Sequence, residues 1–301
     1  MNNITAIVLT FNESMHIQRC LDSIRQITEK IIVVDSGSTD GTLKILEKNN
    51  VQTLSRTWPG NHSDQFNWAL KQLPVDTQWV FRVDADEIIS AELAGELQAY
   101  LSLDGAKNVN GIECNRRMKF QGHFIRFGGV GANKVLRLFK YGFGKSESRW
   151  MDEHITIDGE IHALKGFIYD DNLNSLRWWI DKHNGYSSKE AIDILIQKHN
   201  SGLRNLNDAF DSSRSIKIKR LLKESIYLKL SPSHRSFLYF IYRYFVCLGF
   251  LDGKKGFRFH FLQAYWYRYL VDLKVLEVEE YMQHKGIGLK DAIEDKLGYR
   301  L

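Results

Sequence analysis

The sequence contains few of the residues that build disulfide scaffolds or long linkers. Its 301 residues include 3 cysteines, which are scattered and form no Cys-x-x-Cys or Cys/His finger spacing. This spacing disfavours a disulfide framework and a structural zinc site, and it favours a reducing compartment. Only 3 prolines and no low-complexity tract are present, so long linkers are not expected.

Long hydrophobic runs and two common nucleotide-binding motifs are also missing. No apolar run approaches the ~18 residues of a membrane span. Met1 leads directly into the apolar run Ile4–Leu9, without the basic segment and cleavage site of a signal peptide, so we expect no leader. No Gly-x-Gly-x-x-Gly follows this run, which disfavours a dinucleotide fold. No Gly-x-x-x-x-Gly-Lys-Ser/Thr occurs, which excludes a P-loop NTPase.

The composition is that of a folded globular protein. Hydrophobic residues make up 44% and charged residues 26% of the chain, which excludes disorder and fibrous structure. The length allows one large α/β domain or two smaller domains.

The first hundred residues alternate between strand and helix patterns. Strands are expected at 4–9, 30–35, 51–54 and 79–83, and helices at 13–27, 39–49, 61–72 and 91–101. This alternation predicts βαβ units and a mainly parallel sheet flanked by helices. Further strands are expected at 111–120, 134–139 and 163–168, a helix at 173–197 and helices from 216 onward. We expect an α/β domain over 1–200 and a helical extension over 201–301.

Three polar clusters follow predicted strands. They are Thr10–Glu13, Asp35–Asp40 and Asp84–Asp86. Ligands of open parallel sheets bind beyond the carboxyl ends of the strands, so these clusters are expected to share one site. Helix capping is the simpler explanation for any one cluster, but it does not explain three at equivalent positions.

Asp84 and Asp86 are candidates for a metal site. In an extended chain, residues two apart point the same way. Two carboxylates on one side suit Mg²⁺ or Mn²⁺, which could hold the diphosphate of a nucleotide-sugar. A glycosidase needs its two carboxylates on opposite sides of the scissile bond, which this spacing does not favour.

The three clusters, in this order and spacing, resemble family 2 glycosyltransferases of the GT-A fold. The matching segments are Ile7–Glu13, Ile32–Thr42 and Asp84–Glu87. Further segments, Trp150–His154, Trp179–Asn184 and Gly249–Gly253, are similar to a bacterial subgroup that includes lipopolysaccharide-core and exopolysaccharide glucosyltransferases.

This resemblance implies a role for each matching residue. Thr10, Asn12 and Glu13 would surround the nucleoside, and Asp35 would read uracil. Asp84 would lie near the ribose, and Asp86 would bind the metal. Asp64, Gln65 and Asn67 lie where the family places donor-facing residues, although the usual Gly/Ala-Arg pattern is replaced here.

An inverting transferase also needs a base for the acceptor hydroxyl. Asp152 and Glu153 resemble the acidic motif of the family, and either could be the base; a helix-start acid cluster is the alternative. His154 and His183 are candidates for a further metal or phosphate contact, against a structural role. Arg126, Lys134 and Arg137 suit phosphate or form a solvated basic face. Trp178 and Trp179 suit stacking on a sugar or base, although packing is favoured.

The last third of the chain is basic and aromatic. Residues 203–275 contain 14 Lys and Arg against 5 Asp and Glu, a net charge of +9, and 227–269 hold 15 of the 37 aromatic residues. Basic, aromatic helices that do not span a membrane are typical of attachment to an anionic lipid surface. A packed helical subdomain is the alternative. Nucleic-acid binding is not expected, because no such motif is present.

The sequence therefore predicts an inverting, metal-dependent hexosyltransferase. It would move a sugar from a nucleotide-sugar, most simply UDP-linked, to a bacterial surface glycan or a lipid-linked glycan. We expect it in the cytoplasm, peripheral on the inner face of the cell membrane. The alternatives are a sugar nucleotidyltransferase and a catalytically inactive membrane-associated binding protein.

Overall fold

The computed structural model describes residues 3–103, 106, 108–147, 154–199 and 231–301. The chain forms two compact units, one of residues 1–126 and 130–173 and one of residues 127–129 and 174–301. We expected the boundary near residue 200. The observed boundary lies earlier because helix α5 (Leu176–His199) shares its buried face with the C-terminal helices.

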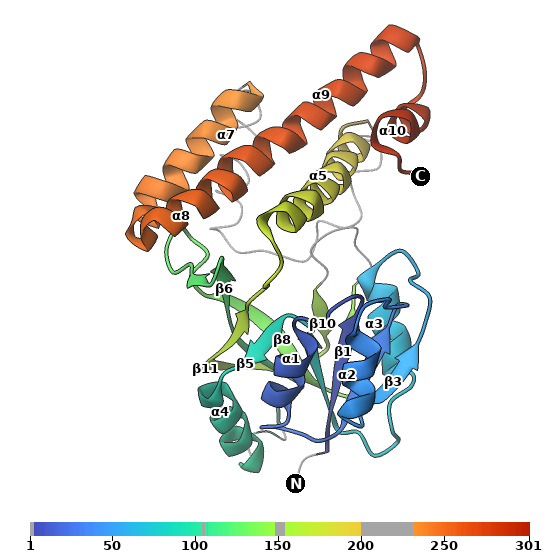
Figure 1. Cartoon of the computed structure of the whole chain (residues 1–301), viewed down its shortest axis with the longest axis vertical. Coiled ribbons are helices and arrows are strands. Elements are labelled where there is room, and N and C mark those ends of the chain that lie inside the picture. The colour runs from blue at the N-terminus through green and yellow to red at the C-terminus, as the bar shows by residue number, and fades with distance from the viewer. Residues whose placement is uncertain (1–2, 104–105, 107, 148–153, 200–230) are drawn as a thin grey trace. The chain divides into compact units, whose positions relative to one another are not determined.

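The first unit is built on a nine-stranded sheet (Figure 1). Its main path runs β3-β2-β1-β4-β8-β6-β11-β5, and β7 pairs with β6. The strands are β1 (Ile4–Thr10), β2 (Ile31–Asp35), β3 (Gln52–Ser55), β4 (Trp79–Asp84), β5 (Glu87–Ile89), β6 (Gly111–Phe120), β7 (His123–Phe124), β8 (Asn133–Lys140) and β11 (Ile161–Asp170). A separate ribbon pairs β9 (Gly144–Ser146) with β10 (Ile155–Ile157).

The predicted fold class is confirmed. Strands β3, β2, β1 and β4 are all parallel, as the βαβ pattern requires. Beyond β4 the sheet becomes mixed: β8 is antiparallel to both β4 and β6, whereas β11 is parallel to β6. The parallel half therefore carries the polar clusters of interest at a single edge.

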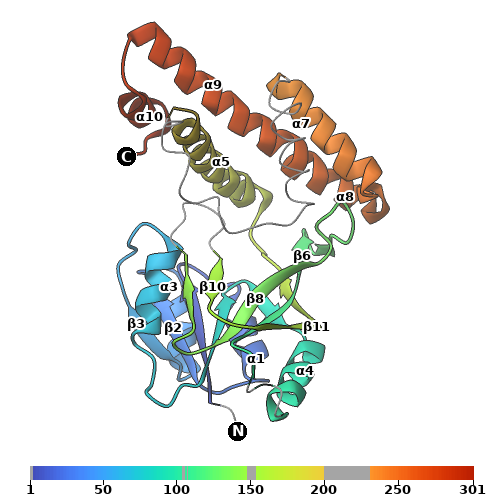
Figure 2. The same cartoon turned by 180° about the vertical axis from the view of Figure 1, so that it is seen from behind.

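Helices cover both faces of this sheet because its central strands bury side chains on both sides. Ala6 and Val8 of β1 pack with α1 (Ile17–Ile24), α2 (Thr42–Lys48) and α4 (Ala91–Ser102). Ile7 points the other way and packs with Phe66 of α3 (His62–Leu70). Figure 1 shows α1, α2 and α4 on the near side of the sheet, and Figure 2 shows α3 on the opposite side.

Helix α1 begins later than expected, at Ile17 rather than Glu13. The backbone N–H groups of Asn12, Glu13 and Ser14 instead bond to side chains of the segment after β2. The residues preceding the helix are thereby held in a loop at the edge of the sheet.

The second unit is helical where the structure describes it. After α5 it contains α7 (Pro232–Ile241), the π-helical turn η3 (Tyr242–Val246), the 3₁₀ turn η4 (Gly249–Asp252), α8 (Gly253–His260), the π-helical turn η5 (Phe261–Trp266), α9 (Tyr267–Lys285) and α10 (Leu289–Leu297). One core joins α5, α9 and α10 through small and β-branched residues such as Ala191, Val271 and Ala292. Across the described part of the chain, no helix is long and apolar enough to cross a membrane.

Candidate functional site

Strand pairing brings the three polar clusters to one edge of the sheet. Thr10, the last residue of β1, lies opposite Asp35, the last residue of β2. Leu9 lies opposite Asp84 at the end of β4. The predicted convergence of the clusters is therefore confirmed by the register of three neighbouring parallel strands.

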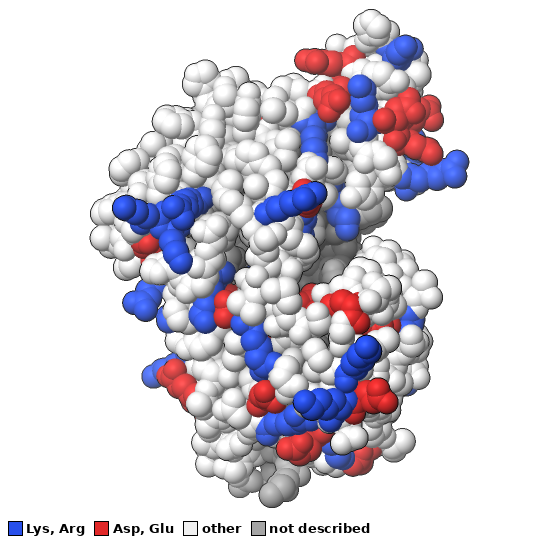
Figure 3. All heavy atoms as spheres, viewed as in Figure 1, with Lys and Arg blue, Asp and Glu red and all other residues white. Residues whose placement is uncertain are grey.

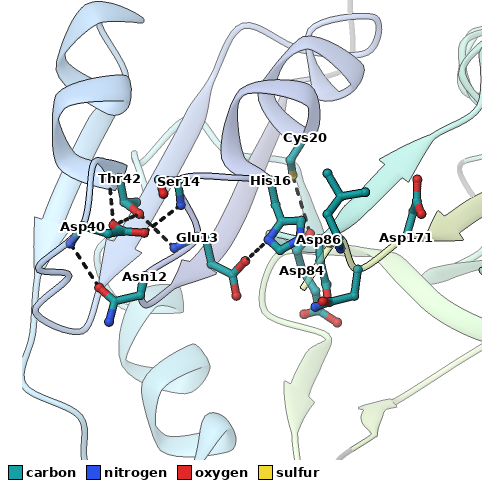
Figure 4. Close-up of polar contacts among 12 residues, drawn as sticks. Asn12, Glu13, Ser14, His16, Cys20, Asp40, Thr42, Asp84, Asp86 and Asp171 are labelled. Carbon is teal, nitrogen blue, oxygen red and sulfur yellow. Dashed lines mark hydrogen bonds and ion pairs between the residues drawn. The ribbon is translucent and has the colours of Figure 1, made fainter. Parts of the chain in front are cut away.

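Asn12 organises the loop after β2. It adopts a positive φ of 56°, a conformation that asparagine tolerates better than most residues. Its Oδ1 accepts a 2.8 Å hydrogen bond from the backbone N–H of Thr39, and Ser38 Oγ accepts from the N–H of Asn12. Asn12 thus ties the loop after β1 to the loop after β2 (Figure 4).

Asp40 fixes the same loop from the other side. Its carboxylate accepts hydrogen bonds from the backbone N–H groups of Ser14 and Thr42 and from the Thr42 hydroxyl. Partial burial opposes ionisation of Asp40, but these hydrogen bonds outweigh it and lower its pKa to about 2. The loop is therefore held by a carboxylate that stays charged.

Glu13 is engaged by His16. Glu13 Oε2 lies 2.5 Å from His16 Nδ1, and His16 Nε2 accepts a 2.9 Å hydrogen bond from the backbone N–H of Leu173. A ring nitrogen that accepts carries no proton, so the other nitrogen donates to Glu13. The nucleoside role implied for Glu13 remains a prediction.

Asp35 and Thr10 are both buried at the ends of their strands. The Asp35 carboxylate accepts hydrogen bonds from the N–H groups of Gly37 and Ser38, so it shapes the turn that follows β2. Thr10 Oγ1 is buried and, within the described residues, has no hydrogen-bond partner. A buried polar atom left unpaired is costly, which makes this hydroxyl a candidate ligand contact.

Arg137 joins Asp84 to Glu87. Arg137 Nη2 donates to Asp84 Oδ2 at 3.0 Å and also to Glu87 Oε1, while Glu87 Oε2 accepts from the backbone N–H of Asp84. Arg137 and Glu87 are almost completely buried, whereas the Asp84 side chain is 38% exposed. Arg137, a candidate for a phosphate contact or for a solvated basic face, is therefore buried and bonded to two carboxylates.

Arg137 also sets the charge state of this trio. Burial raises the pKa of Asp84, but the guanidinium groups of Arg137 and Arg82 outweigh it and hold the pKa well below its usual range. Burial raises the pKa of Glu87, with Asp84 adding to the effect and Arg137 opposing it. Asp84 is thus the ionised, accessible carboxylate that could accept a hydrogen bond from a ligand hydroxyl.

Asp86 is held differently from Asp84. Residues 85 and 86 form a turn between β4 and β5, so the extended geometry on which we based the paired carboxylates does not hold there. Asp86 Oδ2 accepts a 2.9 Å hydrogen bond from Asn172 Nδ2, and its backbone carbonyl accepts from the N–H of Asp171. Asp171 in turn pairs with Arg19 and Lys119.

A metal site of protein side chains alone is not formed in the described residues. They contain no group of three or more His, Cys, Asp and Glu residues placed to hold a metal. Mg²⁺ is commonly held by one or two carboxylates together with substrate phosphates and waters. The hard carboxylate oxygens of Asp86, supported by Asn172, fit that mode.

The residues expected to face the donor occupy helix α3. Asp64 is exposed in the first turn of α3. Asn61 caps the helix, and its Oδ1 accepts a hydrogen bond from the backbone N–H of Asp64. Gln65 is buried and donates to Ser36 Oγ, while Asn67 exchanges two hydrogen bonds with the backbone of Ser146. Asp64 is therefore accessible, whereas Asn67 is committed to holding β9.

Other candidates have structural partners or lie elsewhere. Lys134 pairs with Glu113 on the surface. His183 stacks on Trp179 in α5, with ring centroids 3.5 Å apart, and burial lowers its pKa. His154 is exposed. Asp152 and Glu153 lie outside the described residues, so the base remains a prediction.

Several contacts at this edge of the sheet were not anticipated from the sequence. They involve Glu87, His16, Asp40, Asp171 and Asn172. Glu87 and Asp40 stand inside the matching motifs and could have been singled out. Asp171 and Asn172 follow β11, far from the motifs in the chain, and nothing local marks them.

The structure therefore shows an α/β domain with polar residues gathered beyond the ends of β1, β2 and β4. Residues 5–127 match the family described as Glycosyl transferase family 2, and this part of the chain belongs to it. An uncharacterized glycosyltransferase of Rickettsia prowazekii is 28% identical over 206 residues, 65% of this chain and 70% of the relative. The lipopolysaccharide core biosynthesis glycosyltransferase LpsC of Rhizobium meliloti is 27% identical over 195 residues, which cover 62% of this chain and 70% of LpsC.

Two solved structures align with this chain at low similarity. Residues 1–349 of Staphylococcus aureus TarS share 18% identity, with 98% of this chain and 90% of that chain covered and a TM-score of 0.43. Glucosyl-3-phosphoglycerate synthase of Mycobacterium tuberculosis, solved with Mn²⁺ and UDP, shares 20% identity over 38% of this chain and 44% of its own, with a TM-score of 0.32.

Proposed function

We propose that the protein is an inverting, metal-dependent hexosyltransferase that uses a UDP-sugar donor and a bacterial surface glycan or lipid-linked glycan as acceptor. The observation that carries the proposal is the alignment of Thr10 with Asp35 and of Leu9 with Asp84 inside a family 2 glycosyltransferase domain. This register gathers at one edge a hydroxyl and carboxylates that suit the N–H and hydroxyl groups of a nucleoside.

The donor is bound by side chains that the fold has already oriented. Asn12 and Asp40 hold the loop at the nucleoside, and Asp35 lies at its base. Asp84, kept ionised by Arg137, accepts a hydrogen bond from the ribose. Because these groups are fixed before the donor binds, little ordering cost opposes its binding.

Asp86 is the residue that would hold a divalent cation. When bound, such a cation neutralises negative charge on the departing diphosphate. Asn172 keeps the Asp86 carboxylate in one orientation, as outer partners of metal ligands commonly do. Asp64, accessible at the start of α3, faces the donor sugar.

Transfer proceeds by direct displacement. The acceptor hydroxyl oxygen forms a bond to the anomeric carbon as the bond from that carbon to the phosphate oxygen breaks. Asp152 or Glu153 removes the hydroxyl proton, and the electron pair of the broken bond leaves with UDP. A single displacement of this kind inverts the configuration of the anomeric carbon.

The nature of the acceptor is supported by a relative rather than by geometry. LpsC carries a name that assigns it to lipopolysaccharide core biosynthesis. An acceptor of that class is anchored in a membrane, which agrees with the basic C-terminal region. We therefore propose a peripheral position on the anionic inner face of the cell membrane.

The donor assignment is tested with a panel of nucleotide-sugars without acceptor. We expect slow release of free hexose and UDP from one UDP-hexose, dependent on Mn²⁺ or Mg²⁺. Release from a GDP-sugar only, or equal release with EDTA present, would contradict the assigned donor or the assigned metal.

A further inference from the structure

Helix α7 and the turn η3 expose a group of large, mainly apolar side chains. Five large side chains lie on the exposed side, and Phe245 and Val246 are 53% and 66% exposed. The set is Phe237, Leu238, Tyr242, Phe245 and Val246. Their spacing of i, i+1, i+5, i+8 and i+9 corresponds to one side of a helix. The buried side includes Phe240 together with the polar residues Ser236 and Arg243, the last only 6% exposed. A helix packed in a globular protein normally buries its apolar side.

The exposed apolar surface continues across the next elements. Further exposed residues are Leu248, Phe250, Leu251, Phe257 and Phe261. Ring contacts join the two groups: Tyr244 lies 5.1 Å from Phe245 and 5.6 Å from Phe257, centroid to centroid. These ten exposed residues of segment 237–261 form the apolar face. A half-exposed aromatic side chain leaves about 100 Å² uncovered, so the face exceeds the few hundred Å² usual for a monomer.

The surroundings of the apolar face are positive. Within residues 231–271 the sole acidic residue is Asp252, and its side chain is buried and accepts from the N–H of Phe127. Lys254 and Arg258 of α8 are exposed beside the aromatic residues. Figure 3 shows the lobe of α7 and α8 dominated by uncharged and basic residues.

We propose that the apolar face inserts into the interfacial region of an anionic lipid bilayer, with Lys254 and Arg258 contacting lipid phosphates. The proposal rests on the peripheral location proposed above and names the surface that makes the contact. Aromatic and aliphatic side chains beside cations match the apolar and anionic layers that such an interface presents.

A second copy of the chain fits this surface less well. A two-fold dimer through the apolar face would bring the same patch of both copies together. Lys254 and Arg258 of each copy would then face the like charges of the other, with no exposed carboxylate on the segment to compensate them.

The test is co-sedimentation of the full-length protein with vesicles of phosphatidylcholine alone or mixed equally with phosphatidylglycerol. We expect binding to the anionic vesicles and about a tenfold loss for the double variant Phe245→Ser/Val246→Ser, including the binding that persists in high salt. Val75→Ser, which changes a fully exposed apolar residue of the first unit, is the matched control and should bind normally.

A second pair of variants tests the charges. Lys254→Gln/Arg258→Gln should reduce binding at low salt and have little effect at high salt, because salt screens such contacts. Lys44→Gln/Lys48→Gln on α2 is the control and should have no effect. Circular dichroism of each variant verifies that it is folded.

Three outcomes would overturn the proposal. They are no binding to either vesicle, binding unchanged by Phe245→Ser/Val246→Ser, and a dimer in solution that the same substitutions dissociate. Donor hydrolysis without vesicles should be normal in all four variants. If the unaltered protein binds vesicles but hydrolyses no donor, the result would contradict the transferase proposal. The proposal that the apolar face binds the membrane would be unaffected.

Discussion

The Nη2 nitrogen of Arg137 lies 3.0 Å from Oδ2 of Asp84, at the end of β4. The same nitrogen also bonds Glu87, so one buried guanidinium compensates two carboxylates. Asp84 belongs to the motif at the centre of the proposed donor site, and its orientation therefore depends on a residue of β8 that is distant in the chain.

Replacing Arg137 by Leu should destabilise the protein strongly. The substitution leaves Glu87 buried without its cation, and breaking a buried ion pair costs about 3–5 kcal/mol. Urea denaturation measures this cost, and adding Glu87→Leu to the same chain should restore part of it. Lys134→Leu, on the same strand but in an exposed pair with Glu113, should cost less than about 1 kcal/mol. If Arg137→Leu and Lys134→Leu lower the free energy of unfolding equally, the buried contacts of Arg137 with Asp84 and Glu87 do not cause the loss of stability.

Asp86 and Asn172 should affect metal binding in graded steps. Asp86→Ala should abolish the Mn²⁺-dependent part of UDP binding, because the cation loses its carboxylate. Asn172→Ala should weaken metal affinity about 10–100-fold by releasing that carboxylate, and leave metal-free UDP binding unchanged. Isothermal titration of UDP with and without Mn²⁺ separates metal-dependent from metal-free binding. Asn115→Ala, which removes a hydrogen bond to the backbone of Lys165, is the control. Normal metal affinity in Asp86→Ala would rule out the assigned ligand.

Substitutions of the proposed base should separate binding from catalysis. Asp152→Asn and Glu153→Gln nearly preserve shape, so both should bind donor normally. One of them should lose about 10²–10⁴-fold in kcat, the usual contribution of a positioned base. If both retain normal turnover in a transfer assay, the base lies elsewhere in the chain.

His260 should make the stability of the second unit depend on pH. Burial, with the charge of Arg243 adding to it, lowers the pKa of His260 to about 4 from its usual 6.5. The unfolded chain therefore takes up a proton between these pH values and the folded chain does not, so stability is full above pH 6.5 and falls toward pH 4. The free energy of unfolding should fall by about 2–3 kcal/mol over this range.

The matched variants for this prediction are His260→Leu and His123→Leu. His260→Leu removes the titrating ring and should flatten the pH dependence, whereas His123 is exposed and its substitution should leave the curve unchanged. Denaturant titrations at several pH values measure the slopes. A slope that persists in His260→Leu would assign the effect to another group.

The parallel half of the sheet illustrates what could be predicted locally. The apolar runs of β1, β2 and β4, each followed by polar residues, indicated both the strands and the edge where their ends meet. Hydrophobic periodicity is a local property, and right-handed βαβ connection leaves few alternatives for such strands. For this reason the convergence of the strand ends at one edge of the sheet could be predicted from the sequence.

The second unit illustrates the limit of that reasoning. The sequence showed that its helices are basic and aromatic, but not which aromatic residues are buried. Phe240 and Phe259 are enclosed, whereas Phe245 and Phe257 are exposed. Only the packing of α7, η3 and α8 against neighbouring elements decides this, because one composition allows either side of a helix to face the core.

The sequence by itself determined the order of strands and helices, the family motifs and the charged groups they carry. The tertiary structure alone decided that Arg137 holds Asp84 and that Asn172 holds Asp86. In both contacts the two residues are more than fifty positions apart in the chain. Arg137 lies on β8, which pairs antiparallel with β4, and Asn172 follows the end of β11. Both strands come after the motifs in the sequence. Strand pairing in the folded sheet brings these distant carboxylates and their donors within hydrogen-bond distance. No local pattern in the sequence marks such partners.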